Sequence, residues 1–125
     1  MSLLVDVFVR DADGEMRVLD VPDDVYRSGG FESWRTTVWG SEVVRSLGAR
    51  FLPVLAETDL EVEADQVPEF RSEVALLRAH LEAIARETAR ACAVEEQRRR
   101  IEQRLRIMED CAGRAAGIGG GVLVW

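Results

Sequence analysis

A helix-forming stretch from Pro68 to Ala112, without a glycine or a second proline, constrains the fold of this chain most strongly. Two apolar stripes run along it at helical spacing. The first stripe consists of Phe70, Val74, Leu77, Leu81 and Ile84, and the second of Val94, Ile101, Leu105, Met108 and Ala112. The 17 residues from Ile84 to Ile101 leave an offset of roughly 100° between the stripes on an α-helix. One straight helix therefore cannot present both stripes to the same surface.

The length of this stretch adds a second constraint. A continuous helix to Ala112 would be about 66 Å long, whereas a compact 125-residue domain has a radius of gyration of about 14 Å. Either the helix bends or reverses near Ala91–Val94, or its second half projects and packs against a second chain. A reversal normally uses glycine, proline or a polar turn. Because none is present, the sequence favours a projecting helix and a homodimer through residues 94–112, with an interface formed by Val94, Ile101, Leu105 and Met108.

Both ends of the chain are predicted to form strands. Residues 3–10 and 15–21 are β-rich and flank an Asp-Ala-Asp-Gly turn, in which Gly14 tolerates a positive φ. The first of these strands is apolar on most of both faces, which predicts a central place in the sheet. Near the C-terminus, a flexible Gly-rich connector over residues 117–121 precedes residues 122–125, a β-prone segment expected to return to the sheet as a final strand.

These patterns together predict an α+β fold in a single domain, residues 1–125. The sheet-rich, acidic part covers residues 1–66. A long helix, or a bent helix pair, covers residues 68–114. A small, mostly antiparallel sheet then packs on the first part of this helix.

The segment between the predicted hairpin and the long helix is mostly irregular. Ser41 is a typical N-cap for a short helix over residues 42–47. Residues 50–55 are apolar but contain Pro53, which indicates an edge strand or an irregular approach. Residues 22–41 hold four of the eight aromatic side chains. These four are expected either to line a pocket or to cap the core: Tyr26, Phe31, Trp34 and Trp39.

An alternation of acidic residues marks the segment before the long helix. Strict alternation is the period of a strand with one buried and one solvated face, and it predicts a strand over residues 58–64. The solvated face carries five carboxylates: Glu57, Asp59, Glu61, Glu63 and Asp65. Aligned negative charge suits a basic protein partner, but a charged edge strand also discourages sheet-to-sheet pairing without any partner. Neighbouring carboxylates on one strand face diverge, so no metal site is expected.

The charge distribution narrows the class of partner. The net charge is −7; residues 1–70 carry 15 acidic and 6 basic side chains, and residues 71–125 carry 8 and 10. An acidic first half disfavours nucleic acids and anionic membranes, which bind basic surfaces. All 16 basic residues are arginine and there is no asparagine, a composition typical of a GC-rich, bacterial coding sequence. Without a basic, apolar leader or a long apolar run, a cytoplasmic location is expected.

The sequence contains no catalytic or cofactor motif. His80, the only histidine, lies in the helical pattern without the spacing of a metal-binding motif. Cys92 and Cys111 would lie about 28 Å apart on one straight helix, too far for a disulfide bond. Asp6 is the carboxylate that would point to an enzyme if it lay buried in a cleft. We therefore expect no catalytic residues, no cofactor and no bound metal.

The function that the sequence favours is that of a non-enzymatic protein-interaction module. It would bind a basic protein through the acidic strand, residues 57–65. Bacterial immunity and antitoxin-like proteins are small, acidic and motif-poor in the same way, which is an analogy of type without a shared residue pattern. The alternative is a small-molecule binding or regulatory module with an aromatic pocket at residues 26–39.

Overall fold

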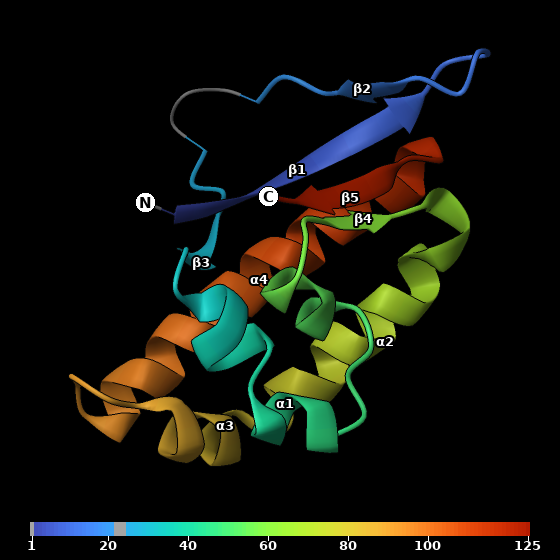
Figure 1. The fold of residues 1–125 in the computed structure, drawn as a ribbon. Helices are drawn as coiled ribbons and strands as arrows, with labels where there is room; N and C mark the ends of the chain where they lie inside the picture. The colour runs from blue at the N-terminus through green and yellow to red at the C-terminus, as the bar shows by residue number, and fades with distance from the viewer. Residues whose placement is uncertain (1, 22–24) are drawn as a thin grey trace.

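The computed structural model describes residues 2–21 and 25–125 and confirms the α+β prediction (Figure 1). In this part of the chain a layer of helices lies against one face of a five-stranded sheet. The strands are β1 (Ser2–Arg10), β2 (Met16–Val18), β3 (Ser28–Phe31), β4 (Leu60–Val62) and β5 (Gly121–Val124). The helices are α1 (Glu42–Ser46), α2 (Val67–Arg78), α3 (Leu81–Thr88) and α4 (Val94–Ile118), and the short helical segments are η1 (Arg35–Trp39), η2 (Leu52–Ala56) and η3 (Ala64–Gln66).

β1 is the central strand of the sheet, as its apolar faces predict. The strand order is β2–β1–β5–β4, and β3 also pairs with β1. All of these pairs are antiparallel. The predicted C-terminal strand is confirmed as β5, in which Val124 pairs with Val5 on one side and with Leu60 on the other. β2 is shorter than the predicted residues 15–21 because Arg17 and Val18 are exposed and provide no buried face to extend it.

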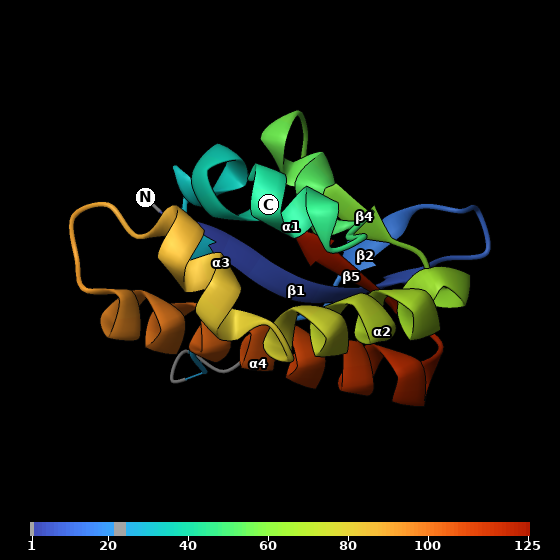
Figure 2. The ribbon, with the colours of Figure 1, turned by 90° about the horizontal axis from the view of Figure 1, so that it is seen from below.

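The long helical stretch folds back on itself, so the prediction of a projecting helix is wrong. α2 and α3 follow one another, the chain reverses over residues 89–93, and α4 returns beside them (Figure 2). At 1.5 Å per residue, the 25-residue α4 is about 37 Å long and the α2–α3 pair spans about 33 Å. The two halves therefore match in length. Both stripes, offset on one helix, belong to a single core once the helices lie side by side.

A buried polar pair closes this reversal in place of a glycine or proline. Thr88 ends α3, Gln97 lies in the first turn of α4, and both side chains are buried. Gln97 Nε2 donates a hydrogen bond to Thr88 Oγ1 (3.1 Å), and Thr88 Oγ1 donates one to the carbonyl of Ile84 (2.7 Å). Buried polar groups are costly without partners. This pair is therefore satisfied only when the two helix ends meet.

The second apolar stripe lies inside the core of the chain itself. Ile101, Leu105 and Met108 are fully buried. Val94, at the start of α4, is exposed. The prediction that Ile101, Leu105 and Met108 form a dimer interface is therefore wrong, because these three side chains pack inside their own chain. From Ile101 onward, the second apolar stripe is not exposed for a homodimer through residues 94–112, because the reversal of the helices buries it within one chain.

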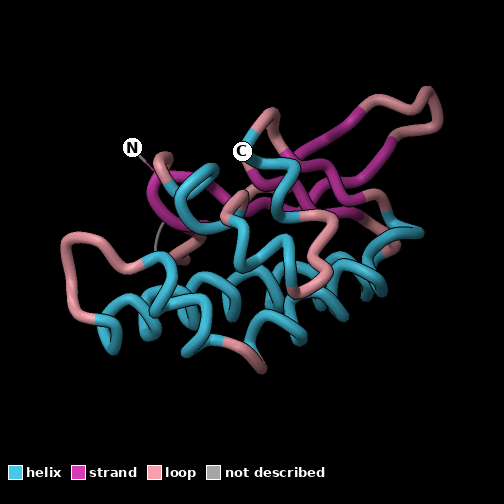
Figure 3. The backbone as a smooth tube through the Cα atoms, turned by 60° about the horizontal axis from the view of Figure 1, so that its bottom comes forward, coloured by secondary structure: helices cyan, strands magenta, loops and turns pink. Residues whose placement is uncertain are grey.

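The middle of the chain holds more regular structure than its sequence predicts. Residues 22–24 of the predicted irregular segment lie outside the described residues; within residues 25–41, β3 pairs with β1 and the helical turn η1 follows it. Figure 3 colours the described helices cyan and the strands magenta. Ser41 caps α1 as predicted, because its Oγ accepts a hydrogen bond from the N–H of Val44 (3.4 Å). Residues 50–55 form no strand: η2 is a 3₁₀ helix. Pro53 lies in its first turn, where a missing N–H costs no helical hydrogen bond.

The glycines after α4 have defined structural roles. α4 runs to Ile118, beyond the predicted end near residue 114. Gly119 then ends the helix at φ +69°, in the left-handed region that favours glycine. A Cβ atom on Gly121 would lie only 2.2 Å from the carbonyl oxygen of Val62. Residues 117–121 are therefore the end of a helix and the start of a closely packed strand, and the prediction of a flexible connector is wrong.

Replacement of Gly121 by alanine tests this close approach. Because a backbone carbonyl blocks the new Cβ, we expect Gly121→Ala to lower the free energy of unfolding by about 2 kcal/mol or more. Gly117→Ala is the matched control, since no atom lies within 4 Å of its added Cβ. Alanine in that helical position should raise stability by up to about 1 kcal/mol. Equal effects in denaturant unfolding would contradict the predicted packing of β5.

Candidate interaction groove

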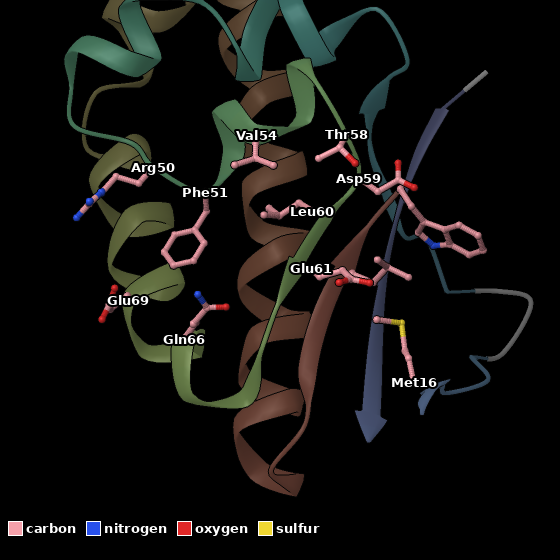
Figure 4. Close-up of a pocket in the computed structure, with 12 residues that line it drawn as sticks. Met16, Arg50, Phe51, Val54, Thr58, Asp59, Leu60, Glu61, Gln66 and Glu69 are labelled. Carbon is pink, nitrogen blue, oxygen red and sulfur yellow. The ribbon is translucent and has the colours of Figure 1, made fainter. Parts of the chain in front are cut away.

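An open groove of about 900 Å³ lies beside β4 (Figure 4). Phe51, Gln66 and Glu69 lie on the α2 side of β4, and Met16 of β2 lies on the far side. The groove thus extends around the outer edge of the sheet. Its lining combines apolar side chains with charged ones.

β4 itself is shorter than the predicted acidic strand. It covers Leu60–Val62 in place of residues 58–64. Within β4 the predicted alternation holds, because Leu60 and Val62 are buried and Glu61 is exposed. The strand ends on both sides because η2 precedes it and a capping box begins η3 directly after it.

The five carboxylates of the predicted row do not form one row. Asp59 and Glu61 line the groove, where Glu69 of α2 joins them. The other three lie outside it, at the end of η2 and around η3: Glu57, Glu63 and Asp65. The sequence therefore located the strand, and two of its five predicted acids, Asp59 and Glu61, line the groove.

The lining of the groove has a net negative charge. Three carboxylates and one guanidinium, that of Arg50, line it. Asp59 is paired with Arg35, whose Nη2 lies 2.7 Å from Asp59 Oδ1. In the described part of the chain, Glu61 and Glu69 have no ion pair. These two side chains are therefore the groove acids that remain available to a cationic partner.

A buried carboxylate holds one wall of the groove in place. Glu73 of α2 is 7% exposed and accepts hydrogen bonds from the backbone N–H groups of Arg50, Phe51 (2.9 Å) and Leu52 (2.8 Å). The first N–H groups of a helix have no partner within it, and a charged acceptor satisfies them strongly. Glu73 thereby fixes η2 to α2, which places Phe51 and Val54 along the groove.

A second buried carboxylate orients the opposite wall. Asp6 in the middle of β1 is fully buried; Arg27 pairs with its Oδ1, and Trp125 Nε1 donates a hydrogen bond to its Oδ2 (2.8 Å). Trp125 nevertheless keeps 46% of its surface exposed and lines the groove. Asp6 therefore fixes the direction of the indole ring while part of that ring stays accessible.

Several groove residues have no signal of their own in the sequence. In the sequence, Phe51 and Val54 are recognisable only as members of an apolar run. Glu69 is recognisable only as a residue in the first turn of a predicted helix. The one available signal was the predicted pairing of the C-terminal strand with the sheet, which brings Trp125 near the acidic strand. The hydrogen bonds of Glu73 join segments more than 20 residues apart, and no local pattern reveals them.

The four aromatic residues predicted as a pocket or a core cap separate into two groups. Trp34 and Trp39 are 5% and 0% exposed, with their rings edge-to-face at 5.7 Å. Trp39 Nε1 also donates a hydrogen bond to the carbonyl of Gly29 (2.9 Å). Phe31 and Tyr26 lie on the surface against arginines of α4. The core alternative is thus correct for the two tryptophans, and the four side chains do not line one pocket.

The other residues singled out in the sequence occupy ordinary structural positions. His80 is exposed at the junction of α2 and α3, with its Nδ1 3.0 Å from the carbonyl oxygen of Leu76. Cys92 is half-buried, and burial raises the pKa of the Cys111 thiol. In the described residues, no group of three or more His, Cys, Asp or Glu side chains is arranged to hold a metal ion.

The chain matches no protein-family model, no curated protein and no solved structure. Among residues 2–21 and 25–125, no helix combines the length and the apolar character needed to cross a membrane.

Removal of the Glu73 carboxylate tests how the groove wall is held. Glu73→Ala leaves three backbone N–H groups without their acceptor, so we expect the free energy of unfolding to fall by about 2–5 kcal/mol. Glu69→Ala, one turn earlier and exposed, is the control and should change it by less than about 0.5 kcal/mol. Denaturant unfolding measures both. A Glu73→Ala protein as stable as the control would mean that η2 does not depend on this cap.

A pH titration tests the ion pair beside the groove. Arg10 donates hydrogen bonds to Glu63, with Nη2 2.6 Å from Oε2, and these bonds hold the pKa of the Glu63 carboxyl below its ordinary value of 4.5. A lowered pKa stabilises the fold above that ordinary value, and this stabilisation is lost as the pH falls through the pKa of the folded state. Both side chains are partly exposed, so its size should be about 1 kcal/mol or less.

The expected result is a pH-dependent difference between wild type and Glu63→Gln. Wild type should be slightly more stable at about pH 7, and the difference should shrink as the pH falls through the lowered pKa of the Glu63 carboxyl in the folded state. Glu57→Gln is the control, because Glu57 is exposed and has no ion pair among the described residues. A stability difference for Glu63→Gln that does not change with pH would contradict the lowered pKa.

Proposed function

We propose that this protein is a non-enzymatic protein-interaction module that binds a basic, extended segment of a partner protein in the groove beside β4. The observation that carries the proposal is the lining of the groove. It combines the unpaired carboxylates of Glu61 and Glu69 with apolar surface from Phe51, Val54 and Trp125. Charge would select and steer the partner, and burial of apolar surface would supply affinity.

The charge of the surrounding chain supports a basic partner. Residues 1–70, which provide most of the groove, carry 15 acidic and 6 basic side chains. Such a field accelerates association with a cationic protein and disfavours anionic partners. Because exposed charges are screened by salt, binding should weaken as the ionic strength rises.

The apolar part of the groove supports binding of a protein segment in preference to a free cation. Trp125 is 46% exposed, although most large apolar side chains of this chain are buried. Partly exposed aromatic side chains in a groove are typical anchors of protein interfaces. The two buried carboxylates described above, Asp6 and Glu73, hold the groove walls in position before a partner binds. Such preorganisation reduces the entropic cost of association.

A role like that of immunity or antitoxin-like proteins fits this proposal, since it requires a small acidic protein that captures a basic one. The observations favour the groove over the aromatic pocket at residues 26–39 as the binding surface. Two of the four pocket residues, Trp34 and Trp39, are committed to the core.

Titration with a model peptide tests the proposal. The probe is a six-residue, terminally blocked peptide in which arginine alternates with valine, and the control peptide replaces arginine with glutamate. We expect the arginine peptide to change the fluorescence of wild type but not of Trp125→Phe, because the other two tryptophans are buried. Raising the salt concentration from about 0.05 M to about 0.5 M should weaken binding by about tenfold or more.

A matched pair of charge-reversal variants distinguishes binding in the groove from attraction by the overall negative charge of the protein. Glu61→Arg with Glu69→Arg should abolish binding, because both side chains line the groove. Glu57→Arg with Asp65→Arg changes the net charge equally, but at exposed positions outside the groove, and should retain most of the binding. The proposal fails if wild type does not bind the arginine peptide, or if both double variants lose binding equally.

A further inference from the structure

The hydrogen-bond pattern of β5 shows which of its backbone groups face each neighbouring strand. Leu4 and Trp125 exchange both backbone hydrogen bonds, from the N–H of Leu4 to the carbonyl of Trp125 at 2.8 Å and in reverse at 3.0 Å. Along an antiparallel pair, hydrogen-bonded residue pairs alternate with non-hydrogen-bonded ones. The backbone groups of Trp125 and Leu123 therefore face β1, and those of Val124 and Val122 face β4.

The same alternation orients β4. Leu60 and Val62 pair with Val124 and Val122, so their N–H and C=O groups point toward β5. The backbone N–H and C=O of Glu61 then point away from the sheet, toward the groove that Glu61 lines. Within residues 2–21 and 25–125, neither group has a hydrogen-bond partner. β4 is an edge strand, and its outer edge is open at this residue.

Hydrogen bonds within the chain limit the open edge on both sides. The N–H groups of Glu57 and Thr58 donate to the carbonyl of Val54 at 2.9 and 3.0 Å. The N–H of Glu63 donates to Gln66 Oε1 at 3.0 Å. The open edge is therefore short and is centred on Glu61, in the middle of the groove.

We infer that the basic segment adds to β4 as an extra strand, with one of its residues hydrogen-bonded to the backbone N–H and C=O of Glu61. This inference rests on the proposed function and specifies how the groove holds its partner. Strand addition to a free sheet edge is a general mode of peptide recognition. It also satisfies the two unpartnered backbone groups of Glu61, which side-chain contacts alone would leave bonded to water.

Strand addition also predicts the residue pattern of the segment. Side chains opposite each other on neighbouring strands lie on the same face of a sheet. The residue paired with Glu61 therefore places its side chain beside the Glu61 carboxylate, a position that selects arginine or lysine. Its two neighbours point to the other face. That face carries the helices, and Phe51 packs there against the core and against Phe70 of α2, between β4 and α2 (Figure 4). The expected pattern is basic and apolar residues in alternation.

The charge on β4 disfavours a second copy of this chain as the occupant. If two β4 edges paired through their open positions, the Glu61 carboxylates of both copies would lie close together. Like charges on neighbouring strands destabilise the pairing, and charged edges protect sheets from self-association in this way. A basic segment meets no such repulsion, so the open edge of β4 favours a basic partner over a second copy of this chain.

Backbone methylation of the arginine–valine peptide tests the inference on the wild-type protein. If arginine pairs with Glu61, the N–H of that arginine donates to the Glu61 carbonyl, and the N–H groups of the valines point away from the sheet. N-methylation of the arginines should therefore weaken binding by about tenfold or more, whereas N-methylation of the valines should leave it within about threefold. Equal affinities of the two methylated peptides would overturn strand addition.

A pair of protein variants provides the complementary measurement. Glu61→Thr and Glu61→Pro both remove the carboxylate, but only proline also removes the outward N–H. Proline is tolerated at an edge position whose N–H faces away from the sheet. We expect Glu61→Pro to bind the peptide about three- to tenfold more weakly than Glu61→Thr. Equal binding by two folded variants would contradict the inference.

These outcomes separate the two proposals. If the unmethylated peptide does not bind wild type, the proposed function fails and strand addition fails with it. If that peptide binds but the two methylated forms bind alike, the groove recognises side chains only, and strand addition alone fails. If Glu61→Pro does not fold, as judged by thermal unfolding against Glu61→Thr, the methylated peptides still decide the question on the wild-type protein.

Discussion

The insertion of β5 between β1 and β4 is the interaction on which the rest of the structure depends. β5 is the only strand that links β4 to the sheet in the described residues. Its valines, Val122 and Val124, are fully buried and belong to the same core as the helices. Trp125 follows directly and is held by Asp6 of β1. The groove therefore exists only when the last residues of the chain have returned to the first strand.

The fold-back of the helices is what delivers β5 to that place. A continuous helix from Pro68 to Ala112 would end about 66 Å away from its start. The reversal over residues 89–93 instead brings α4 back beside α2 and α3 (Figure 2). Gly121 then lets β5 pack closely against Val62 of β4, and Gly119 provides the left-handed turn out of the helix. The reversal of the helices, the close packing of β5 against β4 and the groove beside β4 therefore all depend on the same path of the chain.

Local signals in the sequence predicted the elements of the fold well. The apolar faces of β1, the N-cap of Ser41 and the β-prone C-terminus each depend on neighbouring residues, and each prediction is confirmed. The helix reversal could not be predicted in this way. Its turn is closed by Thr88 and Gln97, two residues nine positions apart that become a buried pair only in the folded chain. The phase shift between the two stripes indicated a break but did not distinguish between its two causes.

The candidate site was predictable only in part, for the same physical reason. Acidic alternation located β4 and two of the groove acids, Asp59 and Glu61, because strand periodicity is local. Glu73 and Asp6 act on segments distant in sequence, and their roles follow from the tertiary structure alone. The positions of the two buried tryptophans, Trp34 and Trp39, could not be predicted from the sequence either. An aromatic-rich segment can equally serve the core or a surface, and only packing decides which.

Cross-strand Hα–Hα nuclear Overhauser effects test the central place of β5 most directly. Non-hydrogen-bonded antiparallel pairs bring their Cα atoms to about 4.5 Å, the closest approach between paired strands. The structure places two such pairs on the two sides of β5: Val5 with Val124, and Glu61 with Leu123. We expect a strong Hα–Hα contact for both pairs in the isolated protein. A protein that shows neither contact, or that shows β1 paired directly with β4, would contradict the chain path and the groove built on it.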